Sequence, residues 1–296
     1  SSPSAGPASI LSPSKDAGHG SVPRHGDAFG ARLHPSTSSG CLEPLVLDMA
    51  AAPGGKTTHL VCKTGDRGLV IANDANGARI PPLRAKLQDW GAMNAAITRY
   101  PGEQFGEWFP ETFDKVLLDA PCSGESLRTA ERRKTQPVSD HERQTLHHQQ
   151  VELLVSAFQV LKPGGELVYA TCSLAPEEDE AVLDALLDRY PIQATIEPVD
   201  HVLSTPAPAL TSDGARAFHP QVARAVRLWP HLYDTSGFFA AKIGKRDSVD
   251  AQLSTPPARP LESAGFAPVS RREKASICDH LLQAYGFDLA AVMERQ

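Results

Sequence analysis

The stretch PLVLDMAAAPGGKTTHL, residues 44–60, decides the fold. It passes from an apolar run into a turn of alanines and glycines, and then into a pattern typical of a helix that opens at about Lys56. Small residues let a ligand approach the backbone closely, and a helix N-terminus offers free N–H groups to a carboxylate or phosphate. The spacing fits neither the dinucleotide GxGxxG pattern nor the P-loop. A tight turn without any ligand is the less favoured interpretation.

Strand-like and helix-like segments then alternate along the chain. Short runs rich in Val, Leu and Ile predict strands at 44–50, 68–74, 95–98, 113–120 and 165–172. Helical patterns lie at 56–63, 77–90, 140–161 and 177–189. Asp140 is the predicted N-cap of the third helix, and Gly164 and Gly165 are predicted to end it. Near-continuous apolar strands between helices predict an α/β fold, in which helices cover both faces of a parallel sheet.

The carboxyl ends of these strands carry residues that are capable of chemistry. Asp48, Asp74, Asp119 and Cys172 stand at four of the strand ends, whereas the strand at 95–98 has no such ending. Ligands of parallel α/β sheets bind at this edge. Asp74 is suited to accept both hydroxyls of a ribose, the alternative being that it caps a helix at 75–88.

Two cysteines lie at strand ends: Cys172 directly follows one strand, and Cys122 comes just after another. A single cysteine of this kind is most often a buried, inert thiol. Two thiols at two sheet ends, each with a Ser neighbour, favour a chemical role instead. Cys41, Cys62 and Cys278 lack such a setting and are interpreted as structural or incidental.

Composition limits the class of protein. The chain has 296 residues, of which 41% are hydrophobic and 22% charged, as in ordinary globular proteins. Five cysteines without a CxxC pair indicate neither a disulfide framework nor a zinc ribbon. We find no signal-peptide pattern and no membrane-length apolar run, so the expected compartment is the reducing cytoplasm. The net charge of −6 requires any nucleic-acid surface to be local.

The chain divides into four predicted parts. Residues 1–40 are rich in Ser, Pro and Gly and are interpreted as a disordered or altered N-terminal segment. Residues 41–244, which hold the alternating strands and helices, form the predicted main domain, and residues 245–260 form a polar linker. Residues 261–296 hold one amphipathic helix, which is too short for a core of its own and is interpreted as a tail or the start of an incomplete module.

Four strings resemble the Nol1/Nop2/Sun family of RNA cytosine-5 methyltransferases. They follow the family's order and spacing, and are LDMAAAPGGKTTHL (47–60), FDKVLLDAPCSGE (113–125), LKPGGELVYATCSLAPEEDE (161–180) and RLWPHLYDTSGFFAAKI (227–243). The resemblance implies a Rossmann-like methyltransferase fold with a mostly parallel seven-stranded sheet. It also implies S-adenosylmethionine as methyl donor and RNA as substrate, with ribosomal RNA favoured over transfer RNA. A monomer without metal or membrane partner is expected.

The resemblance also implies roles for single residues. Cys172 in ATCS would be the nucleophile, Cys122 in APCS would assist product release, and Asp119 would lie between donor and target base. Asp74 would hold the donor ribose. The methionine end of the donor would be cradled by Ala50, Ala51, Ala52, Pro53, Gly54, Gly55 and Lys56. The Pro-Cys motif of DNA cytosine-5 methyltransferases would instead nominate Cys122 as nucleophile; we follow the RNA family.

Cytosine chemistry explains the need for two thiols. Carbon 5 of cytosine is a poor nucleophile, and a thiolate that adds to carbon 6 turns the ring into an enamine that can attack a sulfonium methyl. Asp119 is suited to stabilise the charge that develops at the nitrogen 3 edge, if it is protonated or shares a proton. A second thiol can then help to expel the first. Because the thiolate is the reactive form, a lowered pKa is expected for Cys172.

Basic and aromatic residues are candidates for RNA contact. The run RTAERRKTQ (128–136) supplies Arg128, Arg132, Arg133 and Lys134, the alternative being a solvated helix start. The string FHPQVARAVRLWPH (218–231) adds His219, Arg224, Arg227, Trp229 and His231, where Trp229 either stacks on a base or packs in the core. In the family, 237–243 would be an edge or penultimate strand. The acidic run from Pro176 is interpreted as a helix start with acids at its positive end, not as a metal site.

The sequence departs from the family in two places. After the third strand the family usually has an Asp-Gly pair that reaches the donor adenine, where this chain has Pro101 and Gly102. Glu103 or backbone N–H groups are the candidates to replace it. Residues 1–40 also do not resemble the family's RNA-recruiting segment. The alternative function is therefore a catalytically weak, RNA-binding protein with the same fold that acts in ribosome assembly.

Overall fold

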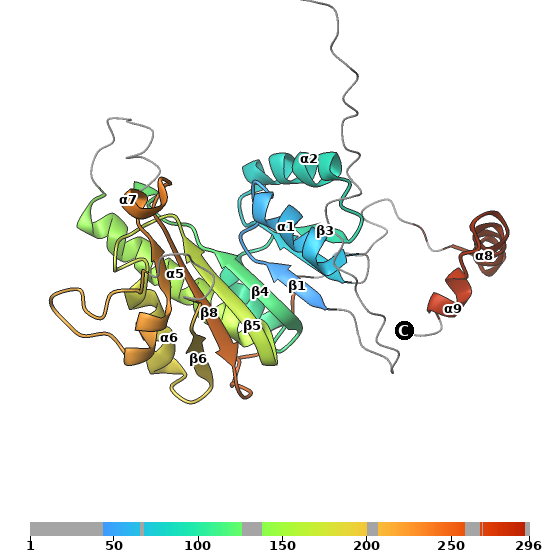
Figure 1. Cartoon of the computed structure of the whole chain (residues 1–296). Helices are drawn as coiled ribbons and strands as arrows, with labels where there is room; N and C mark the ends of the chain where they lie inside the picture. Colours follow the sequence, from blue (N-terminus) through green and yellow to red (C-terminus); the bar gives the residue numbers. More distant parts are fainter. Residues whose placement is uncertain are drawn as a thin grey trace, which may run out of the picture. The chain divides into compact units, whose positions relative to one another are not determined.

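The computed structural model describes residues 44–65, 68–125, 138–199, 207–257, 267 and 269–293. Their strands form one sheet in the order β3-β2-β1-β4-β5-β8-β6, with β7 paired to β8 (Figure 1). The strands are β1 (Leu45–Asp48), β2 (Leu69–Asn73), β3 (Ala95–Thr98), β4 (Phe113–Asp119), β5 (Leu161–Thr171), β6 (Ala194–Glu197), β7 (Val226–Leu228) and β8 (Phe238–Lys245). β8 is antiparallel to its three partners, and the other pairs are parallel.

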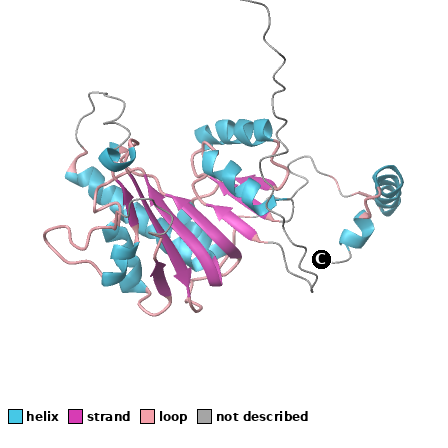
Figure 2. Ribbon diagram, viewed as in Figure 1, coloured by secondary structure: helices cyan, strands magenta, loops and turns pink. Residues whose placement is uncertain are grey.

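Figure 2 draws the strands of this sheet in magenta and the helices in cyan. They are α1 (Gly55–Thr64), α2 (Ile80–Trp90), α3 (Phe105–Trp108), α5 (Asp140–Val160), α6 (Glu180–Arg189), α7 (Pro230–Tyr233), α8 (Arg271–Tyr285) and α9 (Leu289–Met293). Short 3-10 turns are η2 (Gly77–Arg79), η3 (Gly102–Gln104) and η5 (Pro220–Arg224).

Both faces of the sheet are covered, as the apolar strands predict. Successive side chains of a strand point to opposite faces. In β1, Val46 packs in a cluster with Val61 of α1, whereas Leu47 belongs to the main core cluster, which holds Leu153 and Phe158 of α5. The mostly parallel α/β fold is therefore confirmed. The three-residue strand β7 makes the sheet eight-stranded rather than seven-stranded.

The residues predicted to begin and end helix α5 are both wrong. Ser139, not Asp140, caps α5, because its hydroxyl accepts a hydrogen bond from the Glu142 N–H at 3.2 Å. α5 ends at Val160 and β5 begins at once, so Gly164 and Gly165 lie inside the irregular start of β5. A Cβ at Gly165 would approach the Asp114 carbonyl oxygen to 2.9 Å, so this pair serves the close approach of β4 and not a helix end.

The acidic run also differs from its prediction. α6 begins at Glu180 rather than near residue 177, and Glu178, Asp179 and Glu180 are fully buried. The predicted position of the acids at the positive end of the helix is confirmed, because Asp179 is the N-cap residue and Glu180 lies in the first turn. Their buried partners give them separate functions, which are described below.

The segment after β8 makes several contacts with the domain, two of them through serines. The Ser254 N–H and hydroxyl both donate to Glu107, and the Ser248 hydroxyl bonds the Glu111 carboxylate. The predicted tail helix is present as α8, which begins with a capping box between Ser270 and Glu273. No described residue of α8 is buried. Among the described helices, none is long and apolar enough to span a bilayer. Residues 1–40 lie outside the described residues.

Candidate active site

Two thiols meet at the carboxyl edge of the sheet. β4 and β5 are parallel neighbours in a register that pairs Asp119 with Ala170. Cys122 and Cys172 follow these positions by three and two residues, so both loops leave the sheet side by side. The two sulfur atoms lie 2.9 Å apart. The arrangement of strands thus brings together cysteines that are fifty residues apart in the sequence.

The two thiols shift each other's pKa in opposite directions. A hydrogen bond from Cys122 lowers the pKa of Cys172 from 9.0 to about 7, although burial and the Asp119 charge act in the opposite direction. The same hydrogen bond, burial and the Cys172 charge raise the pKa of Cys122. These opposite shifts favour Cys172 as the sulfur that ionises first, with the Cys122 S–H then donating to its thiolate. This matches the property expected for a nucleophilic thiolate at Cys172.

A charged pair lies beside the thiols. Lys56, in the first turn of α1, donates to the Asp119 carboxylate at 2.7 Å, and its ammonium lies 5.4 Å from the centre of the Phe238 ring. A hollow of about 630 Å³ opens here. It is lined by Ala50, Lys56, Arg79, Asp119, Ala120, Pro121, Cys122, Cys172, Leu228, Thr235, Ser236, Gly237 and Phe238. Both thiols and the charged pair therefore face one space that is large enough for a planar base.

A smaller hollow of about 260 Å³ adjoins it, with Ala50, Lys56 and Asp119 common to both. Its remaining lining is Asp48, Ala51, Ala52, Pro53 and Gly55. Gly54 adopts a φ of 106°, which L side chains rarely adopt, so the turn depends on glycine. Six of the seven residues predicted as the cradle of a ligand line this hollow, and Gly54 shapes its backbone.

Asp48 is a polar residue of this hollow that our predicted set of site residues leaves out. Its side chain is fully buried, and burial raises its pKa to about 7. The Thr57 hydroxyl donates to one carboxylate oxygen at 2.6 Å, while the other oxygen has no hydrogen-bond partner among the described residues. An acid at the end of a strand, directly before a small-residue turn, was the available signal.

Asp74 lies apart from the linings of both hollows. Its carboxylate accepts the Ala52 N–H at 3.2 Å and the Asn76 N–H at 2.9 Å, and the Arg79 guanidinium lies 3.3 Å away. Asp74 therefore ties the end of β2 to the small-residue turn. The alternative of a cap for the following helix is wrong, because Asn76 caps η2 and α2 begins only at Ile80.

The residues predicted to contact RNA lie in different environments. Arg128, Arg132, Arg133 and Lys134 lie outside the described residues. Arg227 is fully buried: it bonds Glu180 and is thus removed from any surface role. Its guanidinium lies 5.3 Å from the Trp229 ring, so this indole packs over a protein cation. His219 caps η5, and Arg224 donates to the Ile196 carbonyl.

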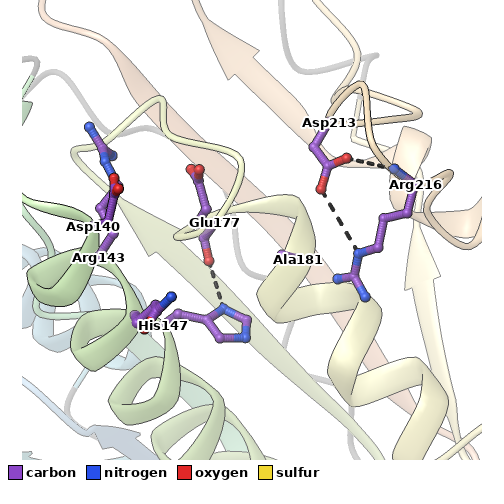
Figure 3. A pocket seen from close by; sticks show the side chains of 8 residues that line it. Asp140, Arg143, His147, Glu177, Ala181, Asp213 and Arg216 are labelled. Carbon is purple, nitrogen blue, oxygen red and sulfur yellow. Dashed lines mark hydrogen bonds and ion pairs between the residues drawn. The ribbon is translucent and has the colours of Figure 1, made fainter.

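A further pocket of about 380 Å³ lies between α5, α6 and the turn that holds Asp213 (Figure 3). It is lined by Asp140, Arg143, Gln144, His147, Glu177, Ala181, Asp213 and Arg216. Its two arginines are already paired, Arg143 with Glu125 at 2.6 Å and Arg216 with Asp184 at 3.3 Å. The pocket therefore presents balanced charge rather than a cationic surface for phosphate. Among the described residues, no cluster of His, Cys, Asp or Glu is arranged to hold a metal ion.

The sheet order, with one antiparallel strand inserted beside β5, and the small-residue turn after β1 define a Rossmann-like methyltransferase. The solved structures agree. A methyltransferase homologue from Pyrococcus horikoshii is 36% identical, covers 69% of this chain and 63% of its own, and has a TM-score of 0.57. The NSun6 protein of the same organism, solved with SFG, is 26% identical over 70% of this chain and 49% of its own, with a TM-score of 0.58.

The chain belongs to the 16S rRNA methyltransferase RsmB/F family, whose model matches residues 41–244. This confirms the family resemblance drawn from the four sequence strings. A ribosomal RNA small subunit methyltransferase F from Klebsiella pneumoniae (strain 342) is 37% identical over 232 residues. A protein described in the same words from Shewanella denitrificans is 36% identical over 244 residues. The two alignments cover 78% and 82% of this chain, which spans about half the length of these relatives, 46% of each.

Proposed function

We propose that the chain is an S-adenosylmethionine-dependent enzyme that methylates carbon 5 of cytosine in ribosomal RNA. The observation that carries this proposal is the pair of sulfur atoms 2.9 Å apart at the ends of β4 and β5, beside Lys56 and Asp119. Covalent catalysis on a pyrimidine needs a thiolate and a partner that helps to release it. The relatives' description as small subunit rRNA methyltransferases supports the choice of RNA.

The smaller hollow fits the donor. Its small-residue backbone admits a ligand closely, and the unpartnered, buried oxygen of Asp48 suits a cationic amino group. Residues 50–56 would hold the methionine end, and Asp74 at the end of β2 would hold the ribose. When bound, the donor supplies an electrophilic sulfonium methyl group. Lys56 and Asp119 line both hollows, which supports a role for them between the donor and the base.

Cys172 begins the reaction in this proposal. Its thiolate, stabilised by the Cys122 S–H, adds to carbon 6 of the cytosine and leaves carbon 5 electron-rich. The Lys56 ammonium, which donates to Asp119, brings positive charge to the side of the hollow where the ring becomes negative. The hydrogen bond from Lys56 gives Asp119 a neighbouring proton donor, which the nitrogen 3 function needs in this proposal.

Cys122 completes the reaction in this proposal. The negative Cys172 sulfur is one cause of the raised pKa of Cys122, so forming a neutral thioether at Cys172 removes that cause. Cys122 can then lose its proton to water and, as a thiolate, take the proton from carbon 5. The electron pair of that C–H bond forms the carbon 5–carbon 6 double bond, and the pair of the carbon 6–sulfur bond leaves with Cys172 as its thiolate. The two thiols therefore exchange protonation roles during one turnover, and each step prepares the next.

The direct test is bisulfite sequencing of small subunit rRNA from cells with and without the gene, complemented with the wild type or with Cys172→Ala. One cytosine should lose its methyl mark without the gene and regain it only with the wild type. An identical methylation pattern in all four samples would contradict the proposal.

The alternative is an RNA-binding protein with little catalytic power. It is favoured by Pro101, which stands where the family has an acid, and by the Asp74 carboxylate, which already bonds Ala52, Asn76 and Arg79. Isothermal calorimetry with S-adenosylmethionine separates the two. An enzyme should bind the donor at micromolar concentration, and a protein that only binds RNA should release no heat with it.

A further inference from the structure

Glu178 is a carboxylate buried without a cationic partner among the described residues. Its side chain is fully buried, and among the described residues its carboxylate accepts hydrogen bonds from three neutral donors. The Ser123 N–H donates to it at 2.8 Å, the Ser173 hydroxyl at 3.0 Å and the Gln150 carboxamide at 3.2 Å. Burying a carboxylate costs free energy unless hydrogen bonds replace its contacts with water. The three donors supply those hydrogen bonds, so burial of Glu178 depends on their positions.

These donors belong to the loops that carry the thiols. Ser123 directly follows Cys122, and Ser173 directly follows Cys172. Gln150, fully buried in α5, also donates to the carbonyl of Pro121, the residue before Cys122, at 2.8 Å. The Glu178 carboxylate therefore connects both cysteine loops. Gln150 links it to α5, because the same carboxamide donates to Glu178 and to the Pro121 carbonyl.

The neighbouring acids do not share this function. Asp179 accepts the Thr171 hydroxyl at 2.6 Å, and Glu180 bonds Arg227 and the Leu210 N–H. Both anchor strands and the segment beside β7. Glu177 is exposed, and it is its backbone carbonyl that contacts His147. Within the acidic run, the bonds to Ser123 and Ser173, the residues that follow the two thiols, are both made by Glu178, whereas Asp179 bonds Thr171, the last residue of β5 before Cys172.

We propose that Glu178 is a positioning residue that holds the two cysteine loops together, so that Cys122 stays within hydrogen-bonding distance of Cys172. Its importance for methylation rests on the proposed function, but its effect on the thiols does not. If the two loops separate, the Cys172 thiolate loses the donor that stabilises it. The protein then keeps its fold while its reactive sulfur ionises at higher pH.

The test is the pH dependence of Cys172 alkylation by iodoacetamide in the full chain, followed at the Cys172 peptide by mass spectrometry. Glu178→Gln keeps the side-chain volume but removes the charge and one acceptor. The inflection should rise by at least about one pH unit, the size expected when a hydrogen bond to a charged sulfur is weakened. Glu177→Gln, the exposed neighbour, should match the wild type.

Ser173→Ala removes one of the three hydrogen bonds to Glu178. It tests the proposal by itself if Glu178→Gln does not fold. It should shift the inflection in the same direction by a smaller amount. In RNA methylation assays both variants should lower kcat at pH 7 while leaving KM for RNA unchanged. A folded Glu178→Gln or Ser173→Ala protein with the wild-type inflection would overturn the proposal. Alkylation needs neither RNA nor donor, so an unchanged inflection would not contradict the proposed methylation. The methylation assay of the wild-type protein tests that function separately.

Discussion

Removing the Cys122 sulfur should change the pH at which Cys172 reacts. The bond from Cys122 is the largest cause of the lowered Cys172 pKa, while burial opposes it. Cys122→Ala deletes the donor and leaves the burial, so the pKa should return from about 7 to 9.0 or higher. At pH 7 the fraction of thiolate should then fall about fifty-fold, from roughly one half to roughly one hundredth. A more basic thiolate is intrinsically more nucleophilic, so the rate should fall less than this fraction.

The inflection of the rate against pH is therefore the better observable. Formation of the covalent adduct with a cytosine-containing RNA should be followed on denaturing gels between pH 6 and 10. The inflection should lie near pH 7 for the wild type and near pH 9 for Cys122→Ala, whose adduct should persist because the release step is missing. Cys122→Ser, which keeps a hydroxyl donor, should fall between them, and Cys62→Ala should behave as wild type. An unchanged inflection in Cys122→Ala, or turnover at the wild-type rate without an adduct, would refute the division of roles.

Three further outcomes are expected. Cys172→Ala should abolish methylation and denaturant-stable adducts with 5-fluorocytosine RNA while the fold persists; an adduct that survives would move the nucleophile to Cys122. Asp74→Ala should weaken donor binding in calorimetry at least about tenfold, since one charge-assisted hydrogen bond contributes about 1.5–3 kcal/mol, and Pro101→Asp should tighten it; unchanged affinity in Asp74→Ala would remove Asp74 from the donor site. Arg227→Met should lower the free energy of unfolding in urea by roughly 3–5 kcal/mol, because it leaves buried carboxylates unpaired, whereas the half-exposed Arg216→Met should lower it by less than about 1 kcal/mol; equal effects would contradict this account.

The meeting of the two thiols could be predicted because it depends on features that a sequence records. Apolar runs of strand length between helices indicate a parallel sheet, and a parallel sheet places all its strand ends at one edge. Adjacency needs one further fact, that the strand before Cys122 lies beside the strand before Cys172. The two strands are sequential, and sequential strands are often neighbours. The small-residue turn after β1 could be predicted for the same local reason.

Side-chain pairings at the site could not be predicted in this way. The bond between Lys56 and Asp119 depends on how α1 is rotated over the sheet and on the β1–β4 register. The unpartnered oxygen of Asp48 depends on Thr57 reaching only one side of the carboxylate. Arg227 resembles a surface cation in the sequence, because its buried partners are forty-seven residues away. Each case depends on a long-range contact that leaves no periodic trace in the chain.

The acidic run at 176–180 shows how charge can mislead a reading of sequence. Consecutive acids are most often solvated, and at a helix start they interact favourably with the helix dipole, so the sequence predicts acids at the positive end of a helix and gives no sign of their burial. In this fold the run instead enters the space under β5, where β7 and α5 supply Arg227 and Gln150 as partners. Burying three acids is tolerated only if each is satisfied separately. Their different partners therefore predict different phenotypes: loss of stability for Glu180, and a shifted thiol pKa with retained stability for Glu178.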